Sequence, residues 1–336
     1  MPLTMPDYKK FSWVIIVLFF GCQTTTKLQR TQGDALGTTY SILYADNRPN
    51  ETVLDSIDAV FLRMNQSMST YWPNSIISKI NSGKEVQTDV DFRNVFSAAQ
   101  QVWKQTDGYF DPTVGALVNA YGFGPTKPLA VIDDKVIDSL LVITGFSNVS
   151  LLENGTVRKA HKNTYFDFNA IAKGYAVDAL AEMLTSLGYL DFLVEVGGEL
   201  YASGMHPEKK QPWRVAIDHP KQEVTRNYIA TRPLQNRGLA SSGNYRKFRT
   251  DEQGTNYVHT INPKTGKTVK SNVLSTSVLA PSAMLADAYA TALMVMPFEI
   301  GKNLIESLAD VDALWVLAEK DSVRVDATKG FTFDLQ

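Results

Sequence analysis

Two apolar periodicities alternate along this sequence, and together they restrict the fold class. Apolar residues three or four positions apart predict amphipathic helices. This spacing occurs at 53–64 and 92–103, at 176–187 before Gly188, and at 283–296 between Ser282 and Pro297. Serine is a favoured helix N-cap, and proline ends a helix.

Runs with a strand-like pattern lie between and after these helices. Trp213, Val215 and Ile217 alternate with polar or small residues, as one buried sheet face requires. Strands are predicted at Phe192–Val196, Trp213–Ile217, Tyr257–Ile261, Val273–Ala280, Ala313–Leu317 and Val323–Val325. Because helices and strands do not alternate as regular βαβ units, we expect one α+β domain with mixed or antiparallel sheets and packed helices.

The N-terminal residues predict export. Lys9 and Lys10 precede an apolar run that is too short to span a bilayer, and the only cysteine, Cys22, follows it. We interpret 1–22 as a lipoprotein signal ending at a lipidated Cys22, 23–33 as a tether and 34–336 as the functional domain. The predicted location is a membrane facing the periplasm, either inner or outer. The alternative is a buried, inert thiol, the usual state of a lone cysteine.

The overall composition is that of an ordinary globular protein. The chain is 44% hydrophobic and 20% charged, with a formal net charge of −2. The sequence has no run of basic residues of the kind that would indicate a nucleic-acid partner. Four histidines without a clustered pair, and no thiol beyond residue 22, do not favour zinc.

Five segments are rich in glycine and small polar residues, although strongly apolar patterns flank them. Binding groups concentrate in such loops, although each segment could also be an ordinary turn. They are Leu36–Tyr40, Met68–Asn81, Gly108–Gly124, Asp167–Asp178 and Ser241–Thr291.

Asp287 and Thr291 form the most informative pair, because residues four apart share one helix face. A carboxylate, a hydroxyl and a main-chain carbonyl would suit Mg²⁺, which prefers oxygen ligands. Alternatively, Asp287 is an acidic residue that the helix dipole stabilises near the N-terminus, and the Thr291 hydroxyl bonds the carbonyl four residues earlier. Lys173-Gly174, at a predicted helix start, could face a phosphate.

Together the segments resemble the ApbE family, the FAD:protein FMN transferases. The motifs that carry the resemblance are Leu36-Gly37-Thr38-Thr39-Tyr40, Met68-Ser69-Thr70-Tyr71, Phe110-Asp111-Pro112-Thr113-Val114-Gly115, Ala172-Lys173-Gly174-Tyr175-Ala176-Val177-Asp178, Gly197-Gly198-Glu199, Ser242-Gly243-Asn244-Tyr245-Arg246, His259-Thr260-Ile261-Asn262-Pro263-Lys264-Thr265-Gly266 and Ala286-Asp287-Ala288-Tyr289-Ala290-Thr291. The chain departs from the usual family pattern at five places. Leu36 stands in place of Met, and Asn169-Ala170 in place of Gly-Gly. Glu199, Asn244 and Asn262 each stand in place of Asp.

The resemblance implies an ApbE-like, T-fold-like domain and a role for each matching residue. Asp287, Thr291 and the main-chain carbonyl of Ala170, or alternatively of Ala172, would bind Mg²⁺. His259 would be the general base. The residues implied to lie against FAD are Leu36, Tyr71, Tyr109, Phe110, Asp111, Asp167, Lys173 and Ile261.

The implied reaction transfers FMN from FAD to a Thr or Ser hydroxyl of an acceptor protein, such as an exported or membrane redox subunit, and releases AMP. Two other functions stay open. In a FAD pyrophosphatase, water would replace the acceptor hydroxyl. A non-catalytic FAD-binding lipoprotein would perform neither reaction.

Overall fold

A computed structural model of the chain describes residues 27–46, 50–220, 227–244, 248–250, 256–320 and 322–336. Residues 1–26, with the predicted signal and Cys22, lie outside this range. Within it, no helix combines the length and apolarity needed to cross a bilayer.

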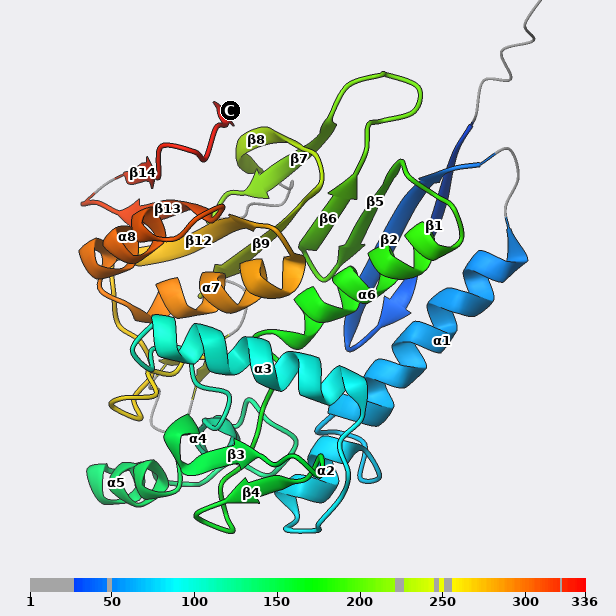
Figure 1. Cartoon of the computed structure of the whole chain (residues 1–336). Coiled ribbons are helices and arrows are strands. Elements are labelled where there is room, and N and C mark those ends of the chain that lie inside the picture. The colour runs from blue at the N-terminus through cyan, green and yellow to red at the C-terminus, as the bar shows by residue number, and fades with distance from the viewer. Residues whose placement is uncertain (1–26, 47–49, 221–226, 245–247, 251–255, 321) are drawn as a thin grey trace, which may run out of the picture.

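One large antiparallel sheet organises the molecule (Figure 1). In spatial order its strands are β1 Leu28–Ala35, β2 Thr38–Ala45, β5 Phe192–Val196, β6 Glu199–Ser203, β9 Arg237–Gly243, β12 Val273–Ala280, β13 Asp312–Ala318 and β14 Val323–Ala327. A smaller sheet, on the opposite side from the helices, contains β15 Asp334–Leu335, β8 Tyr228–Leu234 and β7 Trp213–Asp218. The predicted α+β class with antiparallel sheets is therefore confirmed.

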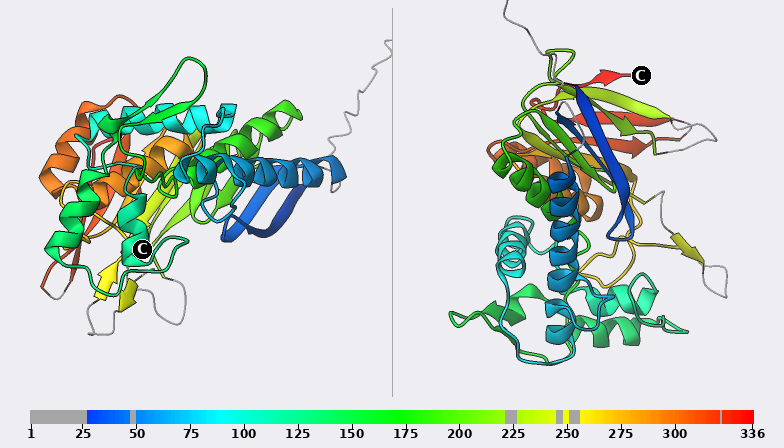
Figure 2. Two further views of the ribbon diagram at one scale, coloured as in Figure 1. Left: turned by 90° about the horizontal axis from the view of Figure 1, so that it is seen from below. Right: turned by 90° about the vertical axis from the view of Figure 1, so that its right-hand side faces the viewer.

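Helices cover one face of the large sheet (Figures 1 and 2). Helices α6 Ala172–Ser186 and α7 Ala283–Val295 pack directly on its strands, and α8 Phe298–Ser307 packs on β13. Helix α1 Glu51–Met68 packs against α6, and α3 Val90–Gln105 packs against α7 and α1. A lower lobe contains α2 Ile76–Asn81, α4 Gly115–Tyr121, α5 Asp134–Val142, the 3₁₀ turn Phe146–Asn148, β3 Val149–Leu151 and β4 Val157–Lys159. Strands β10 Phe248–Thr250 and β11 Asn256–Val258 form a separate hairpin.

The four predicted helices are confirmed, and so are the signals that bound α7. The Ser282 side chain accepts a hydrogen bond from the Leu285 N–H, and the helix ends just before Pro297. Almost every residue of α7 is buried, because the helix lies between the large sheet and the other helices. This burial places Asp287, a charged residue, in the interior with 2% of its surface exposed.

Two predictions at the level of segments were wrong. The tether predicted for 23–33 overlaps β1, which begins at Leu28 and pairs with β2 over eight residues. A polar edge strand lacks the apolar alternation that reveals a half-buried strand. The strand predicted for Tyr257–Ile261 ends at Val258, and Ile261 makes only a single bridge to Thr268 around the Asn262–Gly266 turn.

The start of α7 fits tightly against β9 at a glycine. A Cβ added to Gly238 would lie 2.3 Å from the Ala283 nitrogen, which is closer than two such atoms can approach. The start of α7 can therefore lie this close to β9 only because residue 238 has no side chain.

We predict that Gly238→Ala lowers the free energy of unfolding by about 1–3 kcal/mol, the usual cost of overpacking a core. Urea denaturation monitored by circular dichroism measures this change. Gly301→Ala is the matched control, because the added Cβ would come too close only to the Cδ2 end of the flexible Leu293 side chain, at 2.8 Å, and would lie at an ordinary 3.7 Å from Met296 Cβ. Equal stabilities of the two variants would contradict the packing argument.

Candidate active site

Three buried or partly buried charges meet where α6, α7 and the β5–β6 turn converge. The Lys173 Nζ lies 3.0 Å from Glu199 Oε1 and 3.5 Å from Asp287 Oδ2. Glu199 and Asp287 are 3% and 2% exposed, so water screens these charges weakly. We call Lys173, Glu199 and Asp287 the charge cluster.

The backbone at the start of α6 also contacts this cluster. The Gly174 N–H donates a 3.1 Å hydrogen bond to Asp287 Oδ2. A Cβ on Gly174 would lie 2.3 Å from the Ala283 carbonyl oxygen, so only glycine allows the two helices to approach this closely. Asp178, one turn further along α6, accepts hydrogen bonds from the Ala283 and Met284 N–H groups at the start of α7.

The environment shifts the proton affinities of these groups. Burial raises the pKa of Glu199 to about 7, although Lys173 opposes the shift. Burial also raises the pKa of Asp178 to about 6, against the hydrogen bonds that it accepts. Burial alone would lower the pKa of Lys173, but Asp287 and Glu199 raise it above its ordinary value.

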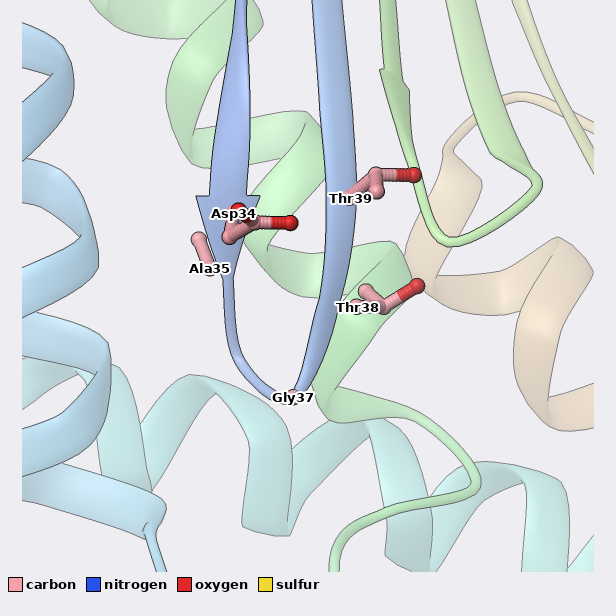
Figure 3. A pocket seen from close by; sticks show the side chains of 5 residues that line it. All are labelled: Asp34, Ala35, Gly37, Thr38 and Thr39. Carbon is pink, nitrogen blue, oxygen red and sulfur yellow. The ribbon is translucent and has the colours of Figure 1, made fainter.

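An open hollow of about 380 Å³ lies at the β1–β2 turn (Figure 3). Its lining residues are Asp34, Ala35, Gly37, Thr38 and Thr39. The turn has two residues, Leu36 and Gly37, whose φ values of 51° and 73° suit a type I′ hairpin. Leucine in this left-handed conformation costs about 1–2 kcal/mol, and its side chain packs against the main core.

The hollow and the charge cluster are neighbours through Gly197. A Cβ there would lie 2.9 Å from Thr38 Cγ2 and 3.3 Å from Glu199 Oε2. Figure 3 shows the side chains of Thr38 and Thr39 pointing toward the β5–β6 turn. The buried Glu199 Oε2 has no hydrogen-bond partner in the part of the chain that the structure describes.

The residues predicted for the metal site lie around this cluster, on α7 and before α6. Thr291, one turn after Asp287 on α7, has its hydroxyl 3.3 Å from Ser242 Oγ on β9. Ala170 is in the turn before α6, and Ala172 is the first residue of that helix. The known contacts of Asp287 use Oδ2, so Oδ1 is the oxygen that could face a cation.

The charge cluster fits a divalent cation. Two carboxylates and one ammonium carry a net charge of −1 when all three are ionised, and a buried Glu199 oxygen lacks a donor. Buried negative charge of this kind is stabilised by a metal ion. In the described residues, no three His, Cys, Asp or Glu side chains form a complete metal cage, so main-chain and hydroxyl oxygens would have to contribute.

Several residues predicted to lie against FAD are enclosed by protein. Phe110 is 3% exposed and belongs to the main core. Asp111 accepts hydrogen bonds from the Thr113 N–H and hydroxyl and from the Phe146 N–H, and Asp167 accepts two from Asn169. Burial raises the pKa of both carboxyls. These two side chains therefore shape the loops around the site.

The remaining predicted residues lie on other loops, where Tyr109, Ile261 and His259 contact residues outside the charge cluster. Tyr71, between α1 and α2, is 61% exposed. The Lys264 Nζ lies 4.6 Å from the ring centroid of Tyr109. Ile261 packs with Leu117 and Tyr121, and the ring of His259 meets that of Phe123 edge-on.

Comparison with known proteins places this arrangement in a family. Residues 36–315 match the family model described as the ApbE family. The chain belongs to the ApbE family.

Relatives across bacteria agree with this assignment. A protein of Haemophilus influenzae named FAD:protein FMN transferase is 37% identical over 287 residues, which is 82% of each chain. The solved flavin transferase ApbE from Vibrio cholerae has a TM-score of 0.81 and 32% identity, covering 91% of this chain and 98% of that one. The apo flavinyl transferase ApbE of Pseudomonas stutzeri has a TM-score of 0.80 and 31% identity, covering 91% and 96%. The predicted family is thus confirmed.

Glu199, Thr38 and Asp178 contact the site but were not among the predicted site residues. Glu199 stood out only as a departure from a motif, although its place directly after Gly197-Gly198 was a usable signal. Two glycines with φ of 63° and 104° close a hairpin and turn the next side chain toward Lys173.

We predict that the stability of the metal-free protein falls as pH rises from about 4 to about 7. Glu199 and Asp178 have folded-state pKa values above their ordinary ones. The native state therefore holds protons that the unfolded chain has released, and this stabilisation disappears as pH passes the folded pKa. For Glu199 the loss is roughly 3 kcal/mol.

Urea denaturation at a series of pH values, in the presence of a chelator, measures this dependence. Glu199→Gln should flatten the curve above pH 6, while Glu182→Gln, on the exposed side of α6, should leave it unchanged. Identical curves for wild type and Glu199→Gln would show that Glu199 is not the group responsible.

Proposed function

We propose that this protein transfers the FMN half of FAD to a hydroxyl of an acceptor protein and releases AMP. The observation that carries the proposal is the charge cluster, which joins one lysine and two buried carboxylates beside an open hollow. The names of the relatives support the same reaction. Phosphoryl transfer needs positioning and charge stabilisation, and little covalent chemistry from the enzyme.

The proposed step is a substitution at phosphorus. The acceptor hydroxyl oxygen bonds to the FMN-side phosphorus, and the bond from this phosphorus to the bridging oxygen breaks. AMP leaves with the bridging oxygen. Lys173 contributes positive charge beside the phosphates, and His259 takes the hydroxyl proton on a ring nitrogen.

Magnesium fits this site as the resident cation. Asp287, the Thr291 hydroxyl and the carbonyl of Ala170, or of Ala172, would hold it. When bound, Mg²⁺ neutralises pyrophosphate charge. The support is the buried net negative charge and the glutamate oxygen that lacks a donor.

One incubation distinguishes the proposed transferase from the two other functions. The protein is mixed with FAD, Mg²⁺ and a candidate acceptor that presents Thr or Ser. AMP together with protein-bound flavin supports transfer. AMP with free FMN indicates a pyrophosphatase, and the absence of AMP indicates a binding protein.

We predict that Asp287→Ala lowers the rate of metal-dependent transfer about a thousandfold, because a metal ion supplies several kcal/mol of charge stabilisation. Protein-bound flavin fluorescence after electrophoresis measures the rate. Asp55→Ala, on the exposed face of α1, is the control. Undiminished transfer by a folded Asp287→Ala variant would refute the metal assignment.

We predict that His259→Ala still binds FAD but labels the acceptor about 100-fold more slowly, the usual contribution of a general base. Flavin fluorescence titration and single-turnover labelling separate the two effects. His161→Ala, at an exposed position, is the control. A wild-type labelling rate in His259→Ala would mean that another group takes the proton.

We also propose that the protein is exported and anchored in a membrane through a lipidated Cys22, on the basis of the apolar run before it. Two acyl chains anchor a protein stably, whereas one chain binds only marginally. Mass spectrometry of the mature wild-type protein should show an acylated N-terminal cysteine. Cys22→Ser should be recovered without lipid, and an unmodified wild-type thiol would refute the anchor.

A further inference from the structure

The most exposed large apolar side chain in the described residues is Leu190, with 69% of its surface exposed. It lies in the short connection between α6 and β5, where nothing in the proposed reaction uses it. A second exposed apolar side chain, Met205, at 42%, follows β6. Leu190 and Met205 thus both lie at loops at one end of the large sheet.

Hydrogen bonds show that these two residues are neighbours. The Ser203 hydroxyl donates to the Leu190 carbonyl, and the Met205 N–H donates to Asp191 Oδ1 at 2.7 Å. A Cβ on Gly204 would lie 2.7 Å from the Leu190 carbonyl oxygen, so the two loops are in contact. The two loops that carry Leu190 and Met205 are therefore held side by side.

The same end of the sheet is where the chain enters the domain. The Ala45 N–H donates to the Asp191 carbonyl, and the Asp46 N–H donates to the Lys27 carbonyl. These bonds connect the start of β1, at Leu28, to the loop that carries Leu190. Figures 1 and 2 show the start of β1 and the β6–β7 loop at one end, with the lower lobe at the other.

The chain between the proposed anchor and the sheet is short. Five residues separate Cys22 from Leu28. Even fully extended, this segment spans at most roughly 20 Å. A lipidated Cys22 therefore keeps this end of the sheet close to the bilayer.

The charges at this end are compatible with a lipid surface. Lys27, Lys209 and Lys210 are exposed, and lysines near a bilayer are attracted to anionic headgroups. Glu208 is the exposed acid in the same loop as two of them. Asp46 and Asp191 are only partly exposed and accept hydrogen bonds within the protein.

We propose that the surface formed by Leu190, Met205 and the three lysines rests on the lipid bilayer. The inference depends on the proposed anchor at Cys22. The bilayer then fixes the orientation of the enzyme. Strand β1 leads away from this surface over eight residues, so the hollow at the β1–β2 turn lies at most about 25 Å further from the lipid, at roughly 3.3 Å per residue. A membrane-bound acceptor would have to present its hydroxyl at that height.

The single cysteine makes a direct test possible. Once Cys22 is acylated, Leu190→Cys carries the only free thiol and takes a polarity-sensitive fluorophore. The acylated protein is reconstituted on vesicles of phosphatidylethanolamine and the anionic lipid phosphatidylglycerol. Val131→Cys is the matched control, because Val131 is 65% exposed and belongs to the opposite, lower lobe.

On vesicles, the probe at position 190 should shift to shorter wavelength and become protected from aqueous iodide, while the probe at 131 should not change. Equal spectra and equal quenching at both positions would overturn the proposal, and so would mass spectrometry showing an unacylated Cys22. Transfer to a soluble acceptor by the same two variants tests the proposed function separately, because Leu190 is outside the site.

Discussion

The close crossing of α6 and α7 is the contact on which the site depends. Gly174 and Gly238 remove the two side chains that would hold the start of α7 away from α6 and from β9. Asp178 then bonds the first two N–H groups of α7 directly. These contacts bring Asp287 next to the start of α6, where Gly174 and Lys173 reach its carboxylate.

The electrostatics of the cluster follow from this geometry. A lone buried lysine or carboxylate would lose its charge, but each group here has an opposite charge within 3.5 Å. The excess of one carboxylate remains uncompensated by protein groups of the cluster. Such an excess of buried negative charge suits a bound cation.

Some elements of the fold are visible in local sequence patterns and others are not, for physical reasons. Helix α7 was predictable because Ser282, Pro297 and a run of apolar residues all act locally. Strands β5 and β12 were predicted with their observed boundaries, since buried strands are continuous apolar runs. Strand β1 was missed because its pairing with β2 requires no apolar pattern.

The charge cluster itself could not be predicted from local patterns. Lys173, Glu199 and Asp287 are far apart in the sequence, and only the topology of the sheet and the two glycine contacts bring them together. Asp287 could be proposed from its spacing to Thr291. Its contacts with Lys173 and Glu199 could not be predicted, because the number of residues between two positions does not give their distance in the folded protein.

The strand order also has a consequence for how the chain folds. Strand β2 joins the sheet by pairing with β5, and Val196 follows its partner Tyr40 by 156 positions in the sequence. Closing so long a loop is entropically unfavourable, and contacts of this kind slow folding. The β1–β2 hairpin can form early from local contacts, but it must wait for β5 during synthesis. The contact that brings Thr38 beside the β5–β6 turn therefore forms late, only after β5 has been made.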